Sequence, residues 1–222
     1  MRFVVLLLLA VSLQPLCAQP TVSQGNTPAW VIPYEFIDIA DTVETTNGYA
    51  YLLISRQSHL ESKEEYCKYV MKVTAEKGLA TVASVNEYFE PSFQKLTFHE
   101  LNIIRNGKKI DKLNPVKFDV LRREDDMDRA MYDKSVNAVY NLPDVRVGDI
   151  VEYAFTRKGF NPAFGDHSFG RFYLQYTIPV AKFAYRVVSD PKRKLVFKTF
   201  GETGVTAQEA QYGKWKETEW IR

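Results

Sequence analysis

The fold is decided by the stretch Asn141-Leu142-Pro143-Asp144-Val145-Arg146-Val147-Gly148-Asp149-Ile150-Val151-Glu152-Tyr153. Pro143 and the Gly148-Asp149 pair interrupt apolar runs, a pattern typical of a strand, a tight turn and a second strand. The preceding segment, residues 91–113, repeats this pattern with Asn106-Gly107 at its turn. Both stretches predict β structure, and neither carries a group of residues that is poised to react.

Apolar residues alternate with polar ones along most of the remaining chain, which favours strands over helices. Gly or Pro signals separate most of these runs. Short strands at such spacing predict an all-β fold, a predominantly antiparallel β-sandwich of about ten or eleven strands with few or no helices. The expected strands cover residues 31–39, 49–58, 66–74, 79–87, 95–105, 116–122, 135–142, 149–156, 171–176, 182–189 and 195–199.

The first eighteen residues have the features of a secretory signal peptide: Arg2, an apolar run over residues 3–13, and Leu16-Cys17-Ala18 as a cleavage site. That run is too short to cross a bilayer, which needs about 20 apolar residues. Lipidation of Cys17 is a second reading, although bulky residues precede it. We expect cleavage after Ala18, export to the periplasm or the outside, and no membrane attachment afterwards.

A segment rich in Gln, Thr, Ser, Gly and Pro follows, and residues 19–29 are expected to form a flexible linker. Residues 30–222 then form the β-sandwich domain. The sequence stops at residues 216–222, within what is expected to be a strand. We therefore expect this domain to be the leading portion of a longer protein, truncated at its C-terminus.

The charge of the mature chain is close to zero. The whole sequence has 29 basic and 27 acidic residues, and residues 1–18 remove only Arg2, which leaves 28 against 27. A chain balanced in this way lacks the basic footprint of a nucleic-acid-binding protein. The local basic cluster Lys192-Arg193-Lys194 follows Asp190-Pro191, and is expected to be the solvated tip of a turn.

Cys67 is the one cysteine that remains after cleavage, so no intramolecular disulfide is expected. Strand alternation places it on the apolar face with Tyr69, Met71 and Val73. A thiol buried there has a raised pKa, whereas a nucleophile needs a lowered one. We therefore expect Cys67 to be a core residue rather than a nucleophile paired with one of the three histidines, which are His59, His99 and His167.

The other polar candidates favour structural roles. His99 lies inside an expected strand, where a hydrogen-bonded sheet histidine is the simpler interpretation. The acidic run at residues 124–128 lacks the ligand spacing and central Gly of a calcium loop, and arginines are interleaved with it. The sequence contains no phosphate loop, metal motif or nucleophile elbow. No catalytic residue, metal site or cofactor is expected.

One segment suggests a contact surface. Residues 160–173 combine phenylalanines with Asn, Asp, His and Arg around Gly and Pro, which predicts a loop. Exposed aromatic rings beside such polar groups are how many β domains bind sugars or peptides. The alternative is that the phenylalanines tuck under the sandwich as a satellite cluster. The candidate binding residues are Phe160, Phe164, His167, Phe169 and Arg171.

The order of four motifs resembles an uncharacterised β-sandwich domain found N-terminal to transglutaminase-like domains in secreted bacterial proteins. The resemblance covers about residues 45–200. The motifs are Pro91-Ser92-Phe93-Gln94-Lys95-Leu96-Thr97-Phe98-His99, Ile104-Arg105-Asn106-Gly107-Lys108-Lys109-Ile110-Asp111, Leu142-Pro143-Asp144-Val145 with Val147-Gly148-Asp149-Ile150-Val151-Glu152-Tyr153, and Ile178-Pro179-Val180.

In that family the catalytic Cys, His and Asp belong to the second domain, and this chain has no matching segment. The resemblance therefore implies a non-catalytic accessory or interaction module, whose partner is a transglutaminase-like domain in cis or in trans. The alternative is a stand-alone carbohydrate- or peptide-binding β-sandwich that uses the loop 160–173. An enzyme built on Cys67 is the third hypothesis.

Overall fold

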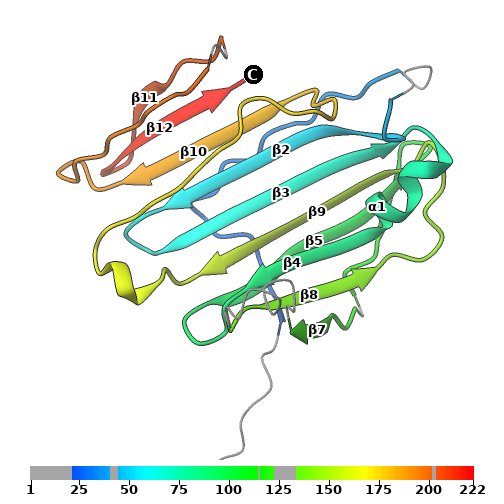
Figure 1. Cartoon of the computed structure of the whole chain (residues 1–222), viewed down its shortest axis with the longest axis horizontal. Coiled ribbons are helices and arrows are strands. Elements are labelled where there is room, and N and C mark those ends of the chain that lie inside the picture. The colour runs from blue at the N-terminus through cyan, green and yellow to red at the C-terminus, as the bar shows by residue number, and fades with distance from the viewer. Residues whose placement is uncertain (1–21, 41–44, 115, 123–133, 202–203) are drawn as a thin grey trace, which may run out of the picture.

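A long sheet of nine strands forms the frame of the molecule (Figure 1). The computed structural model describes residues 22–40, 45–114, 116–122, 134–201 and 204–222. Neighbouring strands are antiparallel except for the β1–β5 and β2–β10 pairs. The strand order is β1 (Ser23–Gln24), β5 (Lys95–Arg105), β9 (Ile150–Lys158), β3 (Glu64–Val73), β2 (Tyr49–His59), β10 (Phe183–Ser189), β12 (Trp215–Ile221) and β11 (Gln208–Tyr212), with β6 (Lys108–Asp111) paired to β5.

A second sheet of three strands packs on one face of this frame, over β5, β9 and β3. Figure 1 shows it in front of the β5 end of the long sheet. Buried residues of both sheets form the main core. The short sheet is ordered β4 (Ser84–Phe89), β8 (Val136–Asn141) and β7 (Asp119–Arg122), and the one α-helix of the described residues, α1 (Leu79–Ala83), leads into β4.

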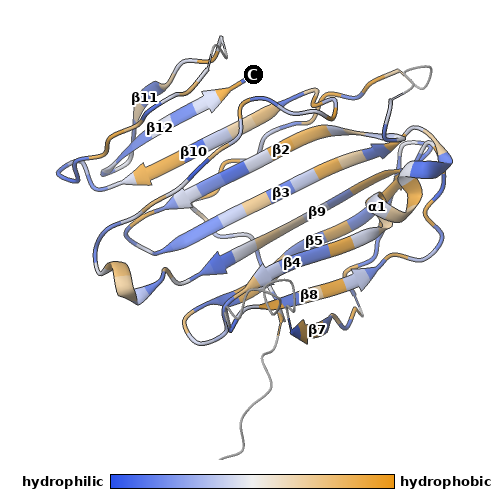
Figure 2. Cartoon of the chain, viewed as in Figure 1, coloured by the Kyte–Doolittle hydropathy of each residue, from blue (hydrophilic) through white to orange (hydrophobic). Residues whose placement is uncertain are grey.

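The predicted fold class is confirmed. The structure is an all-β, mostly antiparallel sandwich, with twelve strands in its described part rather than about ten or eleven. The hairpin predicted at Asn106-Gly107 joins β5 to β6, and both residues adopt the positive φ angles that a tight two-residue turn requires. Figure 2 shows hydrophilic and hydrophobic bands alternating along β2 and β3, as expected for strands with two different faces.

Three predicted strands are wrong. Residues 31–39, 171–176 and 195–199 lie outside every strand. The first two ranges nevertheless alternate between half-buried and exposed side chains. Tyr34 and Phe36 pack on one face of the long sheet, and Phe172 and Leu174 pack on the other. An extended chain lying on a sheet face has the same period as a strand, so periodicity cannot separate the two cases.

The structure changes two further predicted boundaries, at the start of β4 and in the expected linker. The predicted strand 79–87 begins as α1 and becomes β4 only at Ser84. Within the expected linker 19–29, β1 pairs with β5, so that part is attached to the sheet. The expected signal peptide, residues 1–18, and the acidic run at 124–128 lie outside the described residues. No helix in the described ranges is long and apolar enough to cross a membrane.

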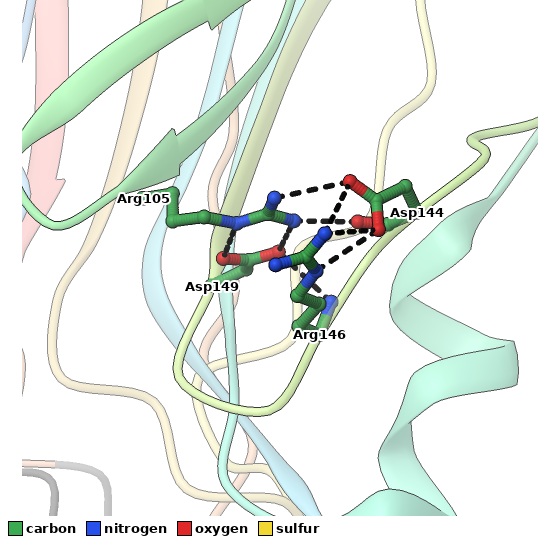
Figure 3. Close-up of polar contacts among 4 residues, drawn as sticks. All are labelled: Arg105, Asp144, Arg146 and Asp149. Carbon is green, nitrogen blue, oxygen red and sulfur yellow. Dashed lines mark hydrogen bonds and ion pairs between the residues drawn. The ribbon is translucent and has the colours of Figure 1, made fainter.

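Two of the motifs meet at the turn before β9 (Figure 3). Arg105, at the end of β5, donates from Nε and Nη2 to the two carboxylate oxygens of Asp149, at 2.8 and 2.7 Å. Its Nη1 donates to Asp144 at 3.0 Å. Arg146 closes the turn by donating its backbone N–H to Asp149 Oδ2 at 2.8 Å and its Nε to Asp144 Oδ1 at 2.9 Å. Hydrogen bonds from Arg105 and Arg146 lower the pKa of Asp144. The two motifs therefore form a turn that charge-assisted hydrogen bonds hold in one conformation.

Cys67 and His99 occupy the structural positions predicted for them. Cys67 is fully buried in the core between the sheets, and burial raises its pKa to about 12. His99 Nδ1 lies 2.9 Å from the Gly25 carbonyl, which can only accept, so Nδ1 carries the proton. His99 Nε2 then accepts from the Thr156 hydroxyl at 2.7 Å. Burial lowers the pKa of His99, which favours this neutral form.

The burial of Cys67 predicts its reactivity. In native protein near neutral pH, we expect iodoacetamide to leave Cys67 unmodified, because the thiol is inaccessible and almost wholly protonated. Mass spectrometry over time would follow the reaction. The same protein in guanidinium chloride should react at the rate of an ordinary thiol. Rapid modification of the native form would contradict the core assignment.

Candidate functional site

A cleft of about 1300 Å³ opens beside the short sheet, on the part of the same face of the long sheet that the short sheet leaves uncovered. Its floor comes from β2, β3 and β9, and β4 contributes to one wall. The segments 160–175 and 194–200 form the rest of the wall and the rim. Most binding pockets for small molecules have volumes of about 300–1000 Å³, so this cleft has room for an extended ligand.

Two arginines and one glutamate form the charged floor. Glu65 on β3 lies directly across from Arg157 on β9, and accepts a hydrogen bond from Arg157 Nη1 at 2.7 Å. Arg56 on β2 bonds to the other carboxylate oxygen of Glu65. Burial by itself would raise the pKa of Glu65, but the two guanidinium groups lower it below its ordinary value. Glu65 is therefore an ionised link between the arginines.

Arg157 also joins the two sheets. Its Nη2 donates to Glu87 Oε2 on β4 at 3.0 Å, and the Tyr153 hydroxyl donates to Glu87 Oε1 at 3.1 Å. The guanidinium lies over the rings of Tyr88 and Phe155, with centroids 4.6 and 4.9 Å away. Burial raises the pKa of Glu87, despite the contact with Arg157. The two acidic partners of Arg157 thus have opposite pKa shifts.

The floor retains hydrogen-bonding capacity. The Nε atoms of Arg56 and Arg157 are buried and donate to no acceptor among the described residues. Buried donors of this kind are uncommon, because each costs about 1–3 kcal/mol when it is left without a partner. Both side chains line the cleft. The floor therefore contains two N–H groups that lack an acceptor, and both are shielded from solvent.

The structure brings together the five predicted site residues along this cleft. Phe160 is half-buried against the neighbouring core cluster, as the alternative interpretation proposed. Phe164 and Phe169 are exposed instead, and their rings meet edge to face at 5.3 Å. His167 donates its backbone N–H to the Phe164 carbonyl at 2.9 Å, and the Arg171 guanidinium lies over the Tyr173 ring.

Contacts at the base and tip hold the loop over the cleft. Gly159, where the chain leaves β9, has a φ of +118°, and an added Cβ would lie 1.9 Å from the Phe93 carbonyl oxygen. Only glycine allows this close passage. At the tip, Arg193 donates from Nη1 to the Asp166 carbonyl at 2.7 Å and from Nε to Glu61 at 2.8 Å. Arg193 in the predicted turn therefore supports the loop, rather than being a freely solvated charge.

Several cleft residues were missed from the sequence. Arg56 and Arg157 fall on the apolar face of otherwise regular strands, and this break in the pattern is the signal that could have singled them out. Phe197 and Phe200 had no such signal, because they follow a turn and lie in no strand. In the described part of the chain, no three His, Cys, Asp or Glu side chains are grouped so that they could hold a metal ion.

The opposite pKa shifts of Glu65 and Glu87 predict different effects on stability. We expect Glu65→Gln to lower the free energy of unfolding at neutral pH by about 3 kcal/mol, because it leaves the half-buried Arg56 and the buried Arg157 without their shared anion. Glu87→Gln should cost about 1 kcal/mol, because an amide resembles the protonated acid that burial favours. Urea unfolding followed by fluorescence would measure both.

The pH dependence provides the control. Because the pKa of Glu65 is lowered in the folded state, the contribution of Glu65 to the free energy of unfolding is complete above its unfolded-state pKa and is lost as pH falls through its folded-state pKa. The difference in stability between the wild-type protein and Glu65→Gln should therefore shrink in acid. The raised pKa of Glu87 has the opposite effect on stability. The free energy of unfolding of the wild-type protein falls as pH rises through the pKa of Glu87 in the folded state. Equal losses at every pH would contradict this assignment.

Comparison with solved structures places the fold among larger proteins. A crystal structure described as a putative protease from Parabacteroides distasonis matches 79% of this chain with a TM-score of 0.64 and 16% sequence identity. The chain spans 35% of that protein, and the likeness concerns the fold alone. Yeast LTA4 hydrolase in complex with bestatin matches 86% of this chain and is covered over 31% of its length, with 10% identity and a TM-score of 0.33. The second likeness is too weak for any argument.

Comparison with the curated proteins gives no match. The model of one protein family, the domain of unknown function DUF3857, matches residues 61–222. This range includes β3 to β12, and therefore the floor residues Glu65 and Arg157 and the whole aromatic loop. Because the match covers well over half of the sequence, the chain belongs to the DUF3857 domain family.

Proposed function

We propose that this chain is a non-catalytic accessory module of an exported protein, and that it positions or covers a transglutaminase-like domain in cis or in trans. The observation that carries the proposal is the aromatic rim of the cleft. Phe169 and Phe200 are 77% and 86% exposed, and Phe164, Tyr173 and Phe197 surround the same cleft. Exposed apolar groups gathered in this way mark interaction surfaces.

The environment of the candidate nucleophile supports a non-catalytic role. Cys67 faces the core between the sheets, where burial raises the pKa of its thiol. His99 bonds to Thr156 and stacks on Tyr66, which point to the opposite face of the long sheet, so its ring is not placed to act as a base for Cys67. A catalytic set, under this proposal, belongs to the partner domain.

The fold comparison is consistent with an accessory role. The similar fold occupies about a third of the longer protein from Parabacteroides distasonis, which leaves room there for other domains. The expected signal peptide at residues 1–18 supports export to the periplasm or the outside.

The accessory role predicts a direct complex. We expect this protein to bind a separately purified transglutaminase-like domain from an exported protein of the same organism, measured by biolayer interferometry. Phe169→Ser with Phe200→Ser should weaken the complex at least about tenfold, because exposed aromatic anchors dominate such interfaces. Leu121→Ser is the matched control, since Leu121 is an exposed apolar residue on β7 outside the cleft. A complex equally sensitive to both changes would argue against this surface.

The gathering of the five predicted residues on one cleft favours a second candidate, a stand-alone carbohydrate- or peptide-binding module. Aromatic rings next to polar groups can stack on sugars or enclose apolar side chains. The polar groups here include Arg171 and His167 at the rim and Arg157 at the floor. The cleft volume of about 1300 Å³ fits a chain-like ligand better than a single small molecule.

The carbohydrate form of this candidate predicts glycan binding that depends on the rim. We expect Phe164→Ala with Phe169→Ala to abolish signals on a glycan array, because both rings would provide the stacking surface. The exposed residue Val147, replaced by Ala, is the control. Glycan signals that persist in the double variant would exclude the loop as the sugar site.

A further inference from the structure

The cleft has an excess of positive charge. Its lining contains five basic residues and two acidic ones, although the chain as a whole is nearly neutral. One of the two acids, Glu65, is already bound between Arg56 and Arg157. The lining bases are Arg56, Arg157, Arg171, Lys194 and Lys198. This imbalance complements a ligand that carries negative charge.

The positive charge is arranged at two depths. Arg171, Lys194 and Lys198 are exposed at the rim, where they attract a ligand through solvent. Arg56 and Arg157 lie at the floor, and the Arg157 side chain is only 8% exposed. The buried Nε–H groups of both floor arginines have no acceptor within the described structure. A carboxylate at the floor would be attracted by the guanidinium charges, which water screens weakly there, and it could accept from the Nε–H groups once these side chains turn toward the cleft.

The walls fit apolar side chains better than sugar rings. The rings at the rim are mostly phenylalanine, among them Phe164, Phe169, Phe197 and Phe200, which lack the hydrogen-bonding tip of Trp or Tyr. The cleft has a larger volume than a pocket for one compact ligand. An extended chain can place alternate side chains on the two walls, and this spacing suits a peptide.

We infer that the cleft binds an extended acidic peptide segment. Its apolar side chains lie against the phenylalanine rim, a carboxylate lies at the guanidinium groups of Arg56 and Arg157 and turns their Nε–H groups toward itself, and the rim lysines pair with further acidic residues. This inference rests on the second function proposed above, the binding module. It does not depend on the accessory role, which is tested with a different partner.

The first test uses defined peptides. A synthetic fluorescein-labelled peptide of about eight residues, in which phenylalanine, valine and glutamate alternate, is titrated with the protein and followed by fluorescence anisotropy. We expect the counterpart with glutamine in place of glutamate to bind about tenfold more weakly. The affinity of the acidic peptide should fall as salt is added, whereas that of the neutral peptide should not.

A matched pair of variants locates the site. Lys194→Glu with Lys198→Glu should raise the Kd of the acidic peptide about tenfold, because both charges line the cleft. Lys192→Glu should change it less than about twofold, because Lys192 is exposed in the same segment but lies outside the lining. All three substitutions are at exposed positions. They should therefore leave the fold intact, whereas Arg157→Gln would disturb the buried ion pairs.

The floor has its own readout. Proton–nitrogen correlation spectra of the arginine side chains should show the Nε–H signals of Arg56 and Arg157 shifting on addition of the acidic peptide, and not of the glutamine peptide. Equal binding of the two peptides, or unshifted signals, would overturn the inference. Binding of a neutral oligosaccharide without peptide binding would also overturn it, while leaving a binding module. Formation of a complex with the transglutaminase-like domain tests the accessory role and not this inference.

Discussion

A long sheet must have both of its apolar faces covered, and the rest of this structure follows from that constraint. The short sheet covers only the part made by β5, β9 and β3, where the main core lies. The part made by β2, β10 and β12 has a second cluster on the same face, around Tyr185 and Trp220. Extended segments and loops, rather than a further sheet, cover that cluster. The candidate cleft lies where the two kinds of cover meet.

On the opposite face, side chains of the sheet provide hydrogen-bond partners for the backbone of an irregular covering segment. Residues 30–39 run across it with no strand partner, and side chains of the sheet take the place of a ladder. Gln57 both donates to and accepts from the backbone of Ile32. The fully buried Arg186 donates to the Trp30 carbonyl at 2.8 Å and is ion-paired with Glu217. Buried polar residues therefore serve as backbone partners for the covering chain.

At the cleft too, a buried polar side chain joins a covering element to the long sheet. Arg157 ties β9 to Glu65 on β3 and to Glu87 on β4, so one guanidinium fixes the position of the short sheet on the long one. The pair with Glu65 is a cross-strand contact, whereas the pair with Glu87 crosses between layers. Because the loops leave this region open, a structural ion-pair network also becomes the floor of a cleft. A site of this kind needs no dedicated motif, and none is visible in the sequence.

The sequence by itself determined the fold class, most strands, the Asn106-Gly107 hairpin and the core position of Cys67, because these depend on local turn chemistry and on period-two alternation. It also identified residues 160–173 as one aromatic segment. Only the tertiary structure decided that residues 31–39 and 171–176 lie on the sheet faces instead of within a sheet, since an extended chain alternates in both cases. Likewise, the meeting of Arg56, Glu65 and Arg157 beneath that segment depends on strand register, which joins residues far apart in the sequence.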